Sequence, residues 1–161
     1  MEQGILLAAV LSLLQHVRHS YRPLTGVMVR DDMGNWTLEE PVPVKMAEPG
    51  LVLFWFGRDL FYANAAFFAE QARRVVDESP SPVRWLVIDA TAITGLDYSA
   101  AQAVAELHKD VAKAGVTLAI VTVPGDRAVN LGRMGLVDLI GANRIFDSRH
   151  ACVAAYKSEC G

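Results

Sequence analysis

Four side chains that could do chemistry lie within eleven positions of one another: Asp89, Thr91, Asp97 and Ser99. They stand between an apolar run that ends in VIDA and a run with helical spacing that begins at Ser99. Two carboxylates can act as general acid and base where a dry, concave site encloses them. A hydroxyl at the start of a helix can instead accept a phosphate, or cap the helix.

The helix expected after this stretch has a well-marked start. Ser99 and Gln102 match the capping-box spacing, in which the hydroxyl accepts a backbone hydrogen bond and the glutamine reaches back. Asp97 offers an alternative local cap. The same helix start would attract a phosphate, because its backbone amides are unpaired and the helix dipole is positive there. A cap and a phosphate site therefore both remain open.

The rest of the sequence does not surround these residues with catalytic partners. The Gly-x-Ser-x-Gly elbow of serine hydrolases is missing, and the four histidines supply no evident base. His16 and His19 stand beside arginines and would make a poor metal site. Neither of the common glycine-rich phosphate motifs occurs. We therefore expect a protein that is not an enzyme, without catalytic residues and without a metal site.

Composition narrows the class of partner. The net charge of -3 and the pI near 5.8 provide no basic surface for nucleic acid. Cys152 and Cys160 lie close together, where a disulfide would close only a short loop, so a reducing cytosolic compartment fits better. The 161 residues, 52% of them hydrophobic, suit one globular domain with some extra sequence.

The extra sequence is at the N-terminus. Residues 4–14, GILLAAVLSLL, are uncharged and would form about 16 Å of helix, half of the ~30 Å hydrocarbon core of a bilayer. Residues 5–10 are apolar all round, which favours lipid over packing on the domain. Arg18 and Arg22, with Tyr21, match the basic cytoplasmic flank of a membrane helix. We predict that residues 1–22 are the end of a last transmembrane helix with its juxtamembrane segment, followed by a domain at 23–161.

Apolar runs of strand length alternate with amphipathic runs through that domain. Strands are expected at residues 23–30, 51–57, 83–90, 116–123 and 143–146, with a polar connection at 32–50. Helices are expected from Asn64, from Ser99, from Asp126 to Met134, and from Asp147 or Ser148 to about Lys157. This alternation predicts an α/β fold. The sheet should be mostly parallel with four to five strands, flanked by about four α-helices and preceded by the remnant of a membrane helix.

Two stretches resemble a known family. VIDATAITGLDYSA resembles the signature of STAS domains, in which one Asp ends a strand and a second precedes a Ser or Thr and a small residue. GLVLFWFGRDLFYANAAFFAEQ resembles the form found in SulP anion transporters, where an aromatic-Ala-Asn sequence opens the first helix. The resemblance covers about residues 51–156. The apolar run and basic flank then resemble the end of the last membrane helix of such a transporter.

The resemblance implies a cytoplasmic regulatory or interaction domain of a secondary-active, sulfate-type anion transporter. Its partner would be the transmembrane domain of the same protein, at the cytoplasmic face of the inner membrane. The alternative is a free-standing phospho-switch similar to the anti-sigma-factor antagonists, which bind a regulatory protein. In that case Ser99 would be the phospho-acceptor within an interaction site that includes Asp89, Thr91 and Asp97, although Tyr98 replaces a smaller residue of those antagonists.

The family resemblance also suggests a nucleotide ligand, GTP, GDP or ATP. A helix start at the carboxyl end of a parallel strand is a common ligand position in open α/β sheets. The phosphates would lie at the amides of Ser99 and Ala100, near Gly95. The base would lie against Phe61 or Tyr62.

Overall fold

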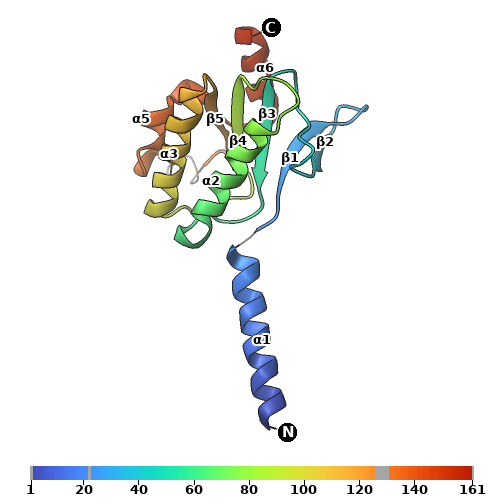
Figure 1. The fold of residues 1–161 in the computed structure, drawn as a ribbon. Coiled ribbons are helices and arrows are strands. Elements are labelled where there is room, and N and C mark those ends of the chain that lie inside the picture. The colour runs from blue at the N-terminus through green and yellow to red at the C-terminus, as the bar shows by residue number, and fades with distance from the viewer. Residues whose placement is uncertain (1, 22, 126–130, 161) are drawn as a thin grey trace.

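The computed structural model describes residues 2–21, 23–125 and 131–160, with the side chains of residues 4–15 in the first helix. That helix, α1 (Glu2–Tyr21), extends away from an α/β domain formed by the rest of the chain (Figure 1). The strands of the domain are β1 (Thr25–Arg30), β2 (Trp36–Glu39), β3 (Leu51–Phe56), β4 (Trp85–Asp89), β5 (Thr117–Val121) and β6 (Ile145–Phe146).

These strands form one mixed, mostly parallel sheet with the order β2-β1-β3-β4-β5-β6. Strands β3 to β6 are parallel, whereas β1 pairs antiparallel with both β2 and β3. The α/β class and the mostly parallel pairing are confirmed. The predicted strand number was too low, because the connection at 32–50 contains β2. This edge strand has four half-buried or exposed residues and therefore lacks the apolar run of a central strand.

Helices cover both faces of the sheet. α2 (Tyr62–Asp77), α3 (Tyr98–Lys113) and α5 (Leu136–Ile140) pack on one face, and α6 (Arg149–Cys160) packs on the other. Each face of the sheet has its own hydrophobic core, and alternate residues of β3 point into one core or the other. Phe54 packs against Phe68 of α2, and Leu53 lies in the cluster with Tyr156 of α6. Burial on both faces explains why the central strands are continuous apolar runs. About four helices on the sheet agree with the prediction.

Several helix boundaries differ from expectation. α2 begins at Tyr62, so Asn64 is its third residue and its side chain accepts the Phe61 amide at 3.0 Å. The helix predicted from Asp126 to Met134 falls partly on residues 126–130, outside the described residues. The last helix starts as predicted, since the Ser148 hydroxyl accepts the Ala151 amide at 3.1 Å.

The helix α1 carries the apolar N-terminal run. Its described residues from 4 to 15 are all exposed, five leucines among them. Among the described residues, no helix combines the length and the apolar character needed to cross a membrane. The basic flank at Arg18 and Arg22, with Tyr21, lies outside the described side chains. The interpretation of residues 1–22 as a membrane-helix remnant stays a prediction.

The topology brings the candidate site to one end of the domain. The carboxyl ends of β3, β4 and β5 and the starts of α2 and α3 lie at the end from which α1 extends (Figure 1). The loops that follow β3 and β4 therefore meet there.

Candidate functional site

Asp89 and Thr91 form a closed polar cluster with an arginine from α6. Asp89 ends β4 and is fully buried. One carboxylate oxygen accepts hydrogen bonds from the Thr91 amide at 3.1 Å and from the Thr91 hydroxyl at 2.7 Å. The other carboxylate oxygen accepts a hydrogen bond from Nε of Arg149 at 2.5 Å. The same guanidinium donates to the Thr91 hydroxyl at 3.1 Å. These bonds tie α6 to the end of β4 and leave Asp89 engaged rather than poised as a general base.

Asp97 joins the first turns of two helices. It is the N-cap of α3, and its Oδ1 accepts the Ala100 amide at 2.8 Å. Its Oδ2 accepts the amide of Tyr62, the first residue of α2, at 2.9 Å. The sequence left a cap at Ser99 and a cap at Asp97 open, and the cap that forms is Asp97. A carboxylate with two acceptor oxygens can satisfy orphan amides of both helices, whereas one serine hydroxyl cannot reach both.

Asp59, which the sequence analysis did not single out, locks the two loops together. Its Oδ1 accepts the Thr94 amide at 2.5 Å, the Thr94 hydroxyl at 2.6 Å and the Gly95 amide at 2.7 Å. The Asn64 side chain donates to the Asp59 carbonyl at 3.0 Å. The available signal was Asp59, shortly after the buried strand, with Asn64 five residues further along the chain. Its partners 35 residues downstream were not visible in the sequence.

Ser99 is the second residue of α3 and is exposed. Within the described part of the chain, its hydroxyl makes no hydrogen bond. It lies in an open groove between α2 and α3, with Tyr62 and Tyr98 at the helix starts and Ala66 and Gln102 further along. The side chain is therefore accessible to a modifying enzyme or a partner, and the fold does not require its hydroxyl.

The five residues predicted to bind nucleotide do gather at this end of the domain. The Phe61 ring covers Gly95, where a Cβ atom would lie 3.0 Å from the ring. The amides of Gly95 and Ala100 are already paired with Asp59 and Asp97. A phosphate at these amides would have to displace two carboxylates of like charge.

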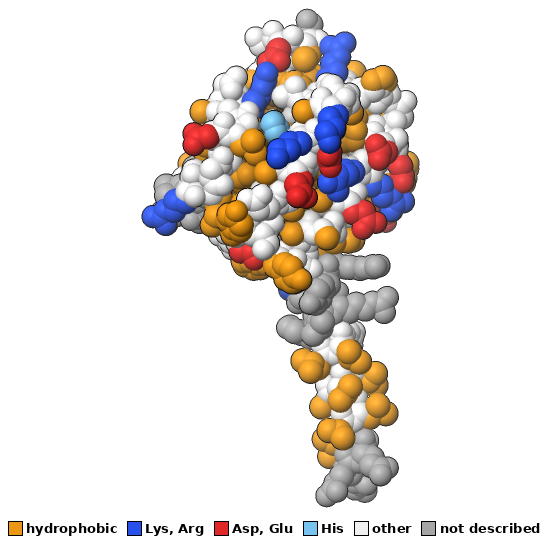
Figure 2. Space-filling model, turned by 60° about the vertical axis from the view of Figure 1, so that its left-hand side comes forward, with side chains coloured by type: hydrophobic (Ala, Val, Ile, Leu, Met, Phe, Trp, Pro, Cys, Tyr) orange, Lys and Arg blue, Asp and Glu red, His pale blue; other side chains and the backbone are white. Residues whose placement is uncertain are grey.

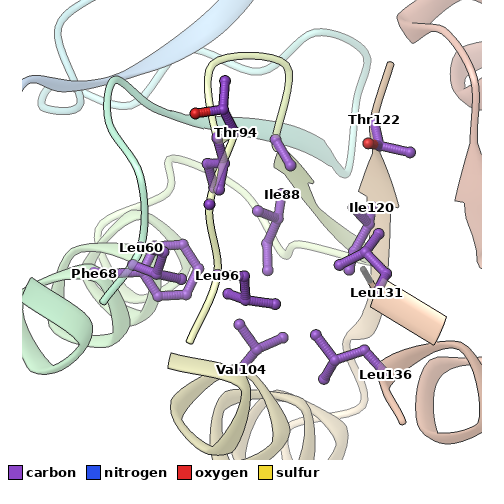
Figure 3. Close-up of a pocket in the computed structure, with 13 residues that line it drawn as sticks. Leu60, Phe68, Ile88, Thr94, Leu96, Val104, Ile120, Thr122, Leu131 and Leu136 are labelled. Atoms are coloured by element: carbon purple, nitrogen blue, oxygen red, sulfur yellow. The ribbon is translucent and has the colours of Figure 1, made fainter. Parts of the chain in front are cut away.

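A small pocket of about 40 Å³ lies under the loop that joins β4 to α3 (Figure 3). Its lining is almost entirely aliphatic, with Leu96, Val104 and Leu136 directed toward one another. Thr94 and Thr122 lie at one end. Of the described residues that line it, none carries a charge, so the pocket suits apolar atoms and offers no cation to a phosphate.

Titratable groups elsewhere give no sign of a reactive centre. Burial raises the pKa of the Cys152 thiol in α6 to about 12, and the nearby Asp89 contributes to the rise. This keeps the thiol protonated and unreactive at neutral pH. In the portion of the chain that the structure describes, no three His, Cys, Asp or Glu residues come together as metal ligands. The side chains of His16 and His19 lie outside that portion.

A family model for the STAS domain matches residues 43–152 of this chain. The chain belongs to the STAS domain family. Among curated proteins, a probable sulfate transporter of Mycobacterium tuberculosis is 30% identical over 156 residues, which cover 96% of this STAS chain and 28% of the relative. Sulfate transporter 2.1 of Arabidopsis thaliana is 30% identical over 154 residues, covering 87% of the chain and 22% of the relative. The STAS chain thus spans between a fifth and three tenths of these two relatives.

Solved structures share the STAS fold. The inward-facing murine Slc26a9 anion transporter superposes with a TM-score of 0.76 at 16% identity, over 97% of this chain and 26% of that one. A sulfate transporter family protein from Wolinella succinogenes superposes with a TM-score of 0.60 at 19% identity, over 74% of this chain and 97% of that one. At these identities the likeness concerns the fold alone.

Proposed function

We propose that this STAS domain is the regulatory and interaction domain of a secondary-active, sulfate-type anion transporter, at the cytoplasmic face of the inner membrane. The observation that carries the proposal is a sequence match to a probable sulfate transporter. The match covers nearly the whole of this chain but less than a third of the length of that transporter. The domain acts on the transmembrane part of the same protein without catalysis. In this proposal the anion passes through the transmembrane part.

The surface through which it acts is the end where α2 and α3 begin. Support comes from two features: the exposed Ser99 hydroxyl stands there, and α1 joins the domain at the same end. Asp59 and Asp97 hold the loops of that end in one arrangement, so the domain presents a fixed surface. A new charge on that surface should change how it meets a partner.

The test is anion uptake by the full-length transporter that contains this domain. Ser99→Asp adds a charge at the proposed surface, and we expect uptake to change at equal membrane abundance. The matched control is Ser81→Asp, which adds the same charge to an exposed serine between α2 and β4, at the opposite end of the domain. Uptake that responds equally to both variants, or to neither, would reject the assignment of this surface.

A phospho-switch is the second candidate, and it is favoured by the exposed Ser99 hydroxyl, which makes no hydrogen bond to the described residues. Phosphorylation would add up to two negative charges beside the first turn of α3. Intact mass after incubation with ATP and an anti-sigma-factor kinase of the source organism should show one phosphate on the wild-type chain and none on Ser99→Ala. Equal labelling of both proteins would exclude Ser99 as the acceptor.

Nucleotide binding stays a prediction, with a direct test. Titration with GTP, GDP or ATP should shift the backbone amide signals of residues 95–101 if the phosphates displace Asp59 and Asp97 from Gly95 and Ala100. Shifts scattered over the surface, at millimolar concentrations only, would remove the reason to retain a nucleotide site.

A further inference from the structure

Large apolar side chains on the surface of the domain gather at the end that carries α1. We call this set the apolar rim: Leu24 is 67% exposed, Phe61 43%, Tyr62 78%, Tyr98 71% and Val123 41%. Four separate segments supply it, namely the connection from α1 to β1, the start of α2, the start of α3 and the segment that follows β5. Figure 2 shows hydrophobic side chains at the lower end of the domain, next to α1.

The rim is held in place rather than loose. The Asp97 carboxylate binds the amide of Tyr62 and caps the helix that begins with Tyr98, so both tyrosines project from fixed first turns. The Phe61 ring lies over Gly95, which Asp59 anchors. An ordered, exposed apolar surface is a candidate contact site.

The chemistry of the rim fits the surface of a bilayer. A tyrosine has an apolar ring and a polar tip, and it is enriched where hydrocarbon meets water. The carboxylates in the rim loops, Asp59 and Asp97, accept hydrogen bonds from backbone amides. Arg58, next to Asp59 in the chain, is exposed. The rim therefore presents amphipathic rings of the kind found where a membrane meets water.

The helix α1 extends this apolar surface. Its side chains from Ile5, 72% exposed, to Leu14, 58% exposed, surround the helix rather than forming one stripe. Seven residues separate Leu14 from Tyr21, which is about 10 Å of helix. The polar headgroup region is about 5 to 7 Å thick on each side of a bilayer. With Leu14 at the edge of the hydrocarbon, the rim lies within a few ångström of the headgroups.

We propose that the apolar rim rests on the headgroup region of the bilayer that receives the apolar segment of α1. The partner is a lipid bilayer surface, contacted by the domain itself and not by α1 alone. The proposal rests on the membrane attachment contained in the proposed function, but it concerns lipid contact and not transport.

The experiment places spin labels on the full chain bound to vesicles of phosphatidylcholine and phosphatidylglycerol. One label is attached at Tyr98→Cys and a control label at Ser81→Cys, each in a Cys160→Ser background. The buried Cys152, with its raised pKa, should not react. We expect vesicles to reduce the access of a water-soluble nickel relaxation agent to the label at position 98 several-fold, and to leave position 81 unchanged. Equal access at both positions, or failure of the chain to bind vesicles, would overturn the proposal.

Vesicle partitioning gives a second readout. The double variant Tyr62→Ser, Tyr98→Ser should partition about tenfold more weakly, because two interfacial side chains are lost. The control is Met33→Ser, which removes a side chain that is 84% exposed in the turn between β1 and β2, far from the rim. Equal losses in both proteins would reject the rim as the contact surface.

One outcome separates this proposal from the proposed function. If position 98 is shielded only in the full-length transporter and not by lipid, the rim contacts protein, and the lipid proposal is wrong. The uptake test at Ser99 would still stand in that case. Conversely, shielding by lipid with unchanged uptake of Ser99→Asp would keep the rim proposal and reject the assigned regulatory surface.

Discussion

Replacing Asp97 by alanine should destabilise the domain more than any change at Ser99. The substitution removes the acceptor of the Ala100 amide at 2.8 Å and of the Tyr62 amide at 2.9 Å. Loss of a helix cap costs about 1 kcal/mol. The second, charge-assisted bond is partly open to water and adds about 1 kcal/mol. We therefore expect Asp97→Ala to lower the free energy of unfolding by about 2 kcal/mol, or the melting temperature by about 4 to 8 °C.

Two matched variants separate the contributions of the two Asp97 hydrogen bonds to the free energy of unfolding. Asp97→Asn keeps one oxygen for the Ala100 amide but turns an NH₂ group toward Tyr62, so about 1 kcal/mol should be lost. Ser99→Ala removes a hydroxyl that has no bond within the described structure and should change stability by less than about 0.5 kcal/mol. This order of the three variants distinguishes a cap at Asp97 from a cap at Ser99.

The assay is urea unfolding of the isolated variants, followed by circular dichroism. The midpoints should fall in the order Ser99→Ala, Asp97→Asn, Asp97→Ala, with the dependence on urea unchanged. A Ser99→Ala midpoint as low as that of Asp97→Ala would refute the reasoning. That result would mean that Ser99 caps α3 and that Asp97 does not stabilise the contact between α2 and α3.

Three further predictions concern groups away from this cap. Arg149→Leu should cost about 3 kcal/mol or more, because the buried Asp89 carboxylate loses its cation, and an unchanged urea midpoint would contradict this. The pKa of the buried Cys152 thiol is raised to about 12, whereas the thiol in the unfolded chain titrates near 9.0. The unfolded chain therefore releases this proton first as the pH rises, and the free energy of unfolding should fall by about 1.4 kcal/mol per pH unit between these values. Cys152→Ala should lack that part of the slope, and equal slopes in the two proteins would exclude the thiol as its cause. The hydrogen bond from Arg73 holds the pKa of Asp110 below its ordinary value, so Arg73→Gln should raise the pKa of Asp110. Carbon NMR titration of the Asp110 carboxyl group measures this change. An unchanged titration midpoint in Arg73→Gln would contradict the role of the Arg73–Asp110 hydrogen bond.

The core elements could be predicted because their signals are local. Strands such as β4 are buried on both faces, so a short apolar run like WLVI, which precedes Asp89, identifies them without knowledge of their neighbours. The helix α3 shows its buried face by spacing, with Val104, Leu107 and Val111 on one side. Alternation of the two patterns then dictates parallel pairing.

The edge strand β2 could not be predicted in the same way. Trp36 and Leu38 are half buried and exposed, respectively, and the strand is paired on one side only. A four-residue strand at an edge needs little apolar sequence, so its stretch looks like a polar connection. Only the antiparallel pairing of β1 with β2, in which Val29 lies opposite Thr37, reveals that the two strands form a hairpin.

For the site, the sequence by itself determined which residue types meet at the carboxyl end of β4: two carboxylates, a threonine and a serine before an amphipathic helix. Local spacing sufficed for that, because strand, loop and helix follow one another in the chain. The tertiary structure alone decided their roles. Asp97 became the cap, and Ser99 was left exposed, because the amide of Tyr62, 35 residues earlier, lies where only a second carboxylate oxygen can accept it. Asp89 became a buried ion-pair partner because Arg149, 60 residues later, is brought to it by the packing of α6. A hydrogen bond between residues so far apart depends on how the layers pack, and no local pattern records that distance.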